Sequence, residues 1–178
     1  MEQRPTMRLD EDDFTLFGLP QRFAMDRPEL DARWRALQAQ VHPDRFAAEG
    51  ASAQRQAMQW AVRINEAYQR LRDPVARAGY LCELRGVPVD AQRHTAMPKD
   101  FLMQQMSWRE ALEEAGSAGE VAALDAQVQA QERSLFSVLE QQLDVSADLQ
   151  AAAQSVRALM FLAKFRADID RRLEVLET

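Results

Sequence analysis

The chain has 178 residues, of which 47% are hydrophobic and 28% charged, so it can form one medium core or two small ones. The net charge of −6 falls entirely in residues 81–178, where 16 acidic residues face 10 basic ones. Such an acidic half argues against nucleic acid or a membrane surface as partner, because both need clustered cations. No apolar run reaches the ~20 residues of a spanning helix and no signal-peptide pattern opens the chain, so we expect a cytoplasmic protein.

Glycine and proline fall between stretches of helical periodicity, and no segment alternates with period two for long, which predicts an all-α fold. Residues 1–10 are expected to form a disordered extension. In the first half, the predicted helices cover residues 12–16, 28–41, 53–71 and 75–84. The apolar residues of the two longer helices recur every three or four positions, which predicts an antiparallel hairpin with a polar loop over 42–52.

Residues 85–99 contain Gly86, Pro88 and Pro98 and are predicted to be a linker between two domains. Three more helices are expected beyond it, over residues 100–115, 120–143 and 146–176. The segment Gly116-Ser117-Ala118-Gly119 should separate the first two. Because the connections are short, neighbouring helices should run antiparallel, which predicts a three-helix bundle over residues 100–178.

The tripeptide His42-Pro43-Asp44 lies at the predicted tip of the hairpin. Pro43 fixes its own φ and disfavours helix at His42, so the loop should be partly ordered before it binds anything. The Asp44 carboxylate is a group that an arginine of a partner can bind with two hydrogen bonds. Three arginines that we expect at the surface beside this carboxylate form a modest basic strip, namely Arg33, Arg35 and Arg45.

Two stretches on either side of this tripeptide carry a family resemblance. The run DFTLFGLP at residues 13–20 and the run INEAYQRLRDPVAR at residues 64–77 resemble the J domain. The resemblance implies a J domain over residues 11–84 that docks on a DnaK-type chaperone. It also implies that His42, Pro43 and Asp44 couple delivery of a client to ATP hydrolysis by that chaperone, so the chain itself is not expected to be an enzyme.

The predicted first helix of the bundle has two apolar faces. At about 100° per residue, Phe101, Gln105, Trp108 and Leu112 share one side. Leu102, Met103 and Met106, which we call the apolar strip, lie on nearly the opposite side together with Glu110. One face can serve the bundle core, and the other is expected to be exposed for a partner. The alternative is that the first domain or the linker covers it.

The stretches DFLMQQMSWREAL at residues 100–112 and VRALMFLAKFR at residues 156–166 resemble the HscB family. This resemblance implies that the second domain binds an IscU-type iron–sulfur scaffold protein and delivers it to an HscA- or DnaK-type chaperone. The scaffold contacts that it implies are Leu102, Met103, Met106, Glu110 and Phe161. Ser107 and Met160 depart from the family pattern, which commonly has an acidic and a basic residue there. The alternative function is a J-type adaptor that delivers another client to a general DnaK-type chaperone.

No metal or cofactor is expected. The chain has one cysteine, Cys82, and two histidines, His42 and His94, and these lack the spacing of a zinc site. An acid–base pair of His42 and Asp44 would be the enzymatic alternative. Such a pair would sit on a protruding tip, where water cannot be excluded from a reaction.

Overall fold

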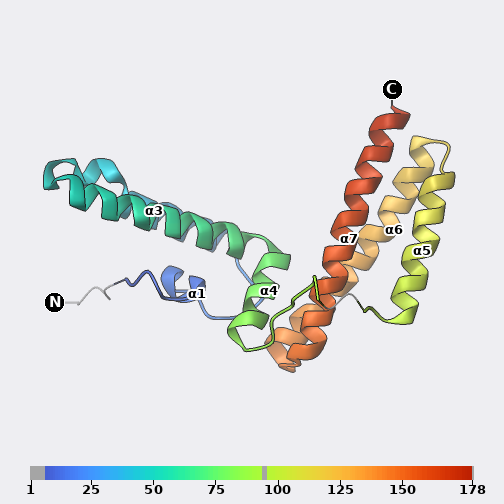
Figure 1. Ribbon diagram of the computed structural model, residues 1–178, viewed down its shortest axis with the longest axis horizontal. Coiled ribbons are helices and arrows are strands. Elements are labelled where there is room, and N and C mark those ends of the chain that lie inside the picture. Colours follow the sequence, from blue (N-terminus) through green and yellow to red (C-terminus); the bar gives the residue numbers. More distant parts are fainter. Residues whose placement is uncertain (1–6, 94–95, 178) are drawn as a thin grey trace. The chain divides into compact units, whose positions relative to one another are not determined.

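The computed structural model describes residues 7–93 and 96–177, so residues 1–6 of the predicted extension and His94 lie outside the described residues. The described residues form helices and no strands, which confirms the all-α prediction (Figure 1). The elements are α1 (Asp13–Phe17), α2 (Arg27–Val41), η1 (Pro43–Glu49), α3 (Ala51–Arg72), α4 (Pro74–Leu84), α5 (Lys99–Glu114), α6 (Ala118–Glu140), η2 (Gln141–Val145) and α7 (Leu149–Leu176). The chain divides into two compact units, one ending at Leu81 and the other beginning at Cys82.

Helices α2 and α3 form the hairpin of the first unit. Helix α2 begins at an aspartate cap, where the Asp26 carboxylate accepts a hydrogen bond from the backbone N–H of Glu29 at 3.3 Å. It ends at His42, whose ψ of 127° is the extended conformation that a following proline favours. The boundaries of α2 therefore come from local sequence.

The facing sides of α2 and α3 hold the hairpin together. Leu30 and Ile64 are completely buried between these helices and the rest of the unit. At the edge of the contact, the Trp34 ring stacks on Tyr68 with centroids 4.3 Å apart, and its indole N–H donates to the Asn65 side chain at 3.0 Å. Burial of each large apolar side chain contributes roughly 1.5–3 kcal/mol. The hairpin is therefore stabilised mainly by packing and has a defined register.

The short helix α1 is fixed to α3 by a buried charge. Asp12 caps α1 and Gly18 ends it with a left-handed φ of 64°. Asp13 is completely buried, and its carboxylate lies 2.8 Å from Arg63 Nη1 and 3.3 Å from Arg70 Nη1. A buried carboxylate is tolerated when it is paired in this way.

The predicted polar loop over residues 42–52 is wrong. Residues Pro43–Glu49 form the 3-10 helix η1, and α3 begins at Ala51, two residues earlier than predicted. Pro43 suits the first position of such a turn, and the backbone N–H of Arg45 donates to the His42 carbonyl at 3.0 Å. The tip of the hairpin is thus a short helical segment that packs against α3.

Helices α5, α6 and α7 lie side by side and form the bundle of the second unit (Figure 1). Leu162, Phe165 and Ile169 of α7 are fully buried in its core. The other buried members of the core are Trp108, Ala115, Val121, Leu124 and Val128, with Phe101, Leu112, Leu135, Leu173 and Leu176 partly buried against them. Phe101, Trp108 and Leu112, which the sequence predicts on one side of the first bundle helix, are among these residues.

Two helix starts in the bundle differ from the prediction. Helix α6 begins at Ala118 within the predicted break, because Ser117 caps it and the Glu120 carboxylate accepts from the backbone N–H of Gly116 at 2.7 Å. Helix α7 begins at Leu149, three residues later than predicted. Asp148 caps it, and the π-helical turn η2 precedes it. Capping side chains, more than the glycines, decide these boundaries.

The segment before α5 is attached to the bundle. The side chains of Val89 and Met97 are buried, and Arg157 of α7 donates to the Val89 carbonyl at 2.7 Å. Arg85 donates to the Leu143 carbonyl at 2.9 Å. The described part of the predicted linker therefore packs on the second unit.

Candidate functional site

The His42-Pro43-Asp44 tripeptide lies where α2 ends and η1 begins, and its two polar side chains are exposed. The backbone N–H of Asp44 donates to Nδ1 of His42 at 3.3 Å, so this nitrogen acts as an acceptor. The 3.6 Å between the same nitrogen and the Asp44 carboxylate is therefore not an ion pair. With a side chain that is 90% exposed, Asp44 is available to a partner.

Neighbouring residues of η1 and α2 support the tripeptide. Arg45 Nη1 donates to the Ala39 carbonyl at 3.0 Å, which ties η1 back to the last turn of α2. Phe46, on the other side, lines a pocket of about 310 Å³ with Val41 and Trp60. The exposed carboxylate is thus presented by a supported segment, which lowers the entropy lost on binding.

The three arginines predicted as a basic strip differ in their surroundings. Arg35 is exposed on α2, as expected. The Arg33 side chain is 42% exposed, but its guanidinium is engaged within the chain. Its Nη1 donates to the carbonyls of Phe17 and Gly18 at 2.9 and 3.1 Å, and its Nη2 binds Glu29 at 2.8 Å. The guanidinium of Arg33 therefore links α1 to α2.

Helix α5 separates its two predicted faces. Gln105 and Trp108 are buried, whereas the apolar strip is exposed by 42% at Leu102, 57% at Met103 and 65% at Met106. Glu110, one turn beyond Met106, is exposed as well. Among the described residues of the second unit, which include part of the predicted linker, no segment covers the apolar strip. An exposed row of three large apolar side chains is typical of a binding surface.

Phe161 of α7 lies next to this helix. Its ring makes an edge-to-face contact with Phe101, with centroids 6.1 Å apart, and it is half-buried. Further along the same pair of helices, Arg109 Nη1 lies 3.8 Å from the Asp168 carboxylate. These contacts place α7 beside α5, with the Phe161 ring next to the residue that precedes Leu102.

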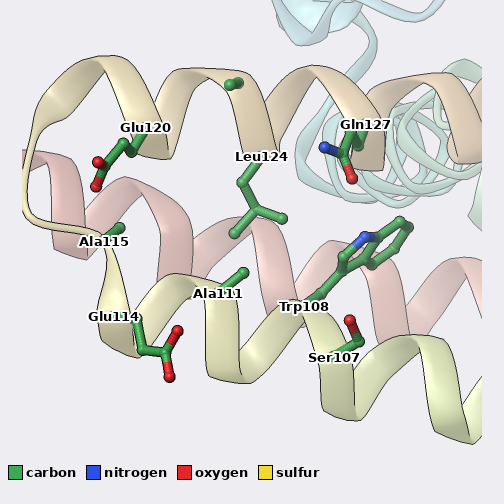
Figure 2. A pocket seen from close by; sticks show the side chains of 9 residues that line it. Ser107, Trp108, Ala111, Glu114, Ala115, Glu120, Leu124 and Gln127 are labelled. Atoms are coloured by element: carbon green, nitrogen blue, oxygen red, sulfur yellow. The ribbon is translucent and has the colours of Figure 1, made fainter.

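A groove that the sequence did not predict runs between α5 and α6 (Figure 2). It has a volume of about 500 Å³, and its small side chains include Ala111 and Ala123. Glu114 and Glu120 lie toward one end of the groove, and Trp108 toward the other (Figure 2). The sequence indicates this groove only through small residues one helical turn apart on α5, namely Ser107, Ala111 and Ala115. Small side chains at these positions leave room between the helices.

Known proteins resemble the chain over almost its whole length. A family model described as the HSCB C-terminal oligomerisation domain matches residues 97–170. The co-chaperone protein HscB homologue of Burkholderia mallei (strain SAVP1) is 53% identical over 172 residues, which are 95% of this chain and 98% of that protein. The chain belongs to the HscB co-chaperone family.

Solved HscB structures have the same architecture. The chaperone HscB from Vibrio cholerae is 37% identical and covers 93% of this chain and 99% of its own, with a TM-score of 0.81. The human co-chaperone HscB is only 23% identical and supports the fold alone, with a TM-score of 0.85 over 96% of this chain and 84% of its own. Among the described residues of this HscB family member, no helix is long and apolar enough to cross a membrane.

Proposed function

We propose that the chain is a co-chaperone of iron–sulfur cluster assembly. It stimulates the ATPase of an HscA- or DnaK-type chaperone and delivers an IscU-type scaffold protein to it. The observation that carries this proposal is the exposed carboxylate of Asp44 on a supported turn at the tip of a helical hairpin. Membership of the HscB family supports the same function.

The chaperone-binding site consists of His42, Pro43 and Asp44 with the exposed Arg35 and Arg45 beside them. An arginine of the chaperone binds the Asp44 carboxylate with charge-assisted hydrogen bonds. Arg33 contributes indirectly, because its bonds to the end of α1 orient the helix that carries the loop. No reaction takes place on this chain, because ATP is hydrolysed on the chaperone.

The scaffold-binding site consists of the apolar strip with Glu110 and Phe161. Full burial of such a side chain contributes roughly 1.5–3 kcal/mol, so the exposed parts of the apolar strip and of Phe161 can supply much of the affinity for a partner. The exposed carboxylate of Glu110 supplies a polar contact at the edge.

A J domain over residues 11–84 and a scaffold-binding domain over residues 100–178, joined by residues 85–99, give the two sites to one chain. A single chain that holds both partners raises the effective concentration of the scaffold at the chaperone. We propose the cytoplasm as the compartment of this activity.

Steady-state ATP hydrolysis by an HscA-type chaperone tests the proposal. The chain and the scaffold should together stimulate hydrolysis by more than the sum of their separate effects. Purely additive rates would contradict delivery by one chain. If an unrelated client protein replaced the scaffold with equal effect, the chain would be a general J-type adaptor.

A further inference from the structure

The chain contains only two lysines, and each lies within one helical turn of a residue of the proposed scaffold site. Lys99 is the first residue of α5, three positions before Leu102 and four before Met103. Lys164 is on α7, three positions after Phe161. Residues three or four apart share one face of a helix, so each lysine is on the same face as part of the proposed scaffold site. Both side chains are exposed.

The other cations of the second unit are mostly engaged within the chain. Of its ten basic residues, seven have partners, namely Arg85, Arg93, Arg109, Arg157, Arg166, Arg171 and Arg172. Among the described residues, Lys99, Arg133 and Lys164 have no hydrogen-bond or ion-pair partner. Two of these three, Lys99 and Lys164, are within one helical turn of the proposed scaffold site, although this half of the chain is acidic.

We propose that Lys99 on α5 and Lys164 on α7 form a cationic rim of the proposed scaffold site and bind acidic side chains on the scaffold protein. This inference rests on the proposed function, since it describes the partner of the same site. It assigns a chemical pattern to that partner: an apolar centre flanked by carboxylates. The contact of Phe161 with Phe101 brings the α7 side of the rim next to the α5 side.

The physical role of such a rim is to orient the partner and accelerate its association. Apolar burial gives affinity but little orientation, whereas charges at two separated points define one docking direction. A lysine can place its methylene stem along the apolar surface while its ammonium stays in water. Exposed ion pairs of this kind are weak individually and are screened by salt.

The binding affinity of the full chain for an IscU-type scaffold tests the rim, measured by isothermal titration calorimetry at two or more salt concentrations. Lys99→Gln and Lys164→Gln should each weaken binding by about 1.5- to 5-fold at low salt. The double charge reversal, Lys99→Glu with Lys164→Glu, should weaken it on the order of 10-fold or more. The double glutamine variant should depend less on salt than the wild type.

Arg133→Glu is the matched control, because Arg133 is an exposed, unpartnered cation on α6. It should leave the affinity unchanged. Helix content by circular dichroism should be the same in all variants. If the wild type bound the scaffold and the double reversal bound equally well, the rim would be disproved while the proposed function remained. If the wild type did not bind at all, the proposed function itself would fail.

A second copy of the chain is the competing occupant of the strip. Sedimentation velocity of the wild type and the double reversal distinguishes it. The inference would be overturned if the double reversal changed the self-association of the chain but left its affinity for the scaffold unchanged. The two lysines would then belong to a contact between two copies of the chain.

Discussion

Replacing Met106 by alanine should weaken scaffold binding without destabilising the chain. Met106 is 65% exposed on α5, so little of its burial contributes to folding and most remains available for a partner. Full burial of a methionine side chain gives about 1.5–3 kcal/mol, and 65% of that is about 1–2 kcal/mol. This corresponds to a loss in affinity of about 5- to 30-fold.

The assay is calorimetric titration of the variant with an IscU-type scaffold, alongside a thermal unfolding curve. Val175→Ala on α7 is a suitable control, because Val175 is 64% exposed and lies outside the apolar strip. It should leave the affinity unchanged. The reasoning would be refuted if Met106→Ala bound the scaffold as tightly as the wild type. A large drop in the melting temperature would refute it too, since an exposed side chain should not support the core.

Three further predictions concern stability and reactivity. Asp13→Asn removes a buried charge between two arginines, and the free energy of unfolding in urea should fall by about 2–4 kcal/mol. An unchanged midpoint of the urea transition would argue against the ion pairs. Gly18→Ala puts a Cβ 2.9 Å from Arg33 Nη1 at a residue with a φ of 64°. The free energy of unfolding, measured in the same urea assay, should fall by about 1–2 kcal/mol. An unchanged free energy of unfolding would mean that the turn relaxes around the new side chain. Burial raises the pKa of the Cys82 thiol, so the folded chain should react slowly with a thiol reagent at pH 8, and fast labelling would contradict this.

The division of α5 into two faces was predictable from the sequence. A helix fixes about 100° between successive residues, so the positions of Trp108 and Met106 on opposite sides follow from their numbers alone. The exposed Asp44 was predictable for a similar reason, because Pro43 ends the preceding helix locally.

Features that depend on how helices approach one another were not predictable in this way. The guanidinium of Arg33 binds the carbonyls at the end of α1 only because α1 packs beside α2. The groove between α5 and α6 likewise depends on the separation of two helices whose facing residues, such as Ala111 and Ala123, are small. The sequence shows the small residues but not the space that they leave.

The most direct test of the account is the ATPase rate of an HscA-type chaperone, measured with its scaffold and with the wild type or Asp44→Asn. Glu49→Gln, which neutralises another exposed carboxylate of η1, serves as the control. The account predicts stimulation by the wild type and by the control, and its loss in Asp44→Asn. Equal stimulation by all three would contradict the role of the His42-Pro43-Asp44 tripeptide.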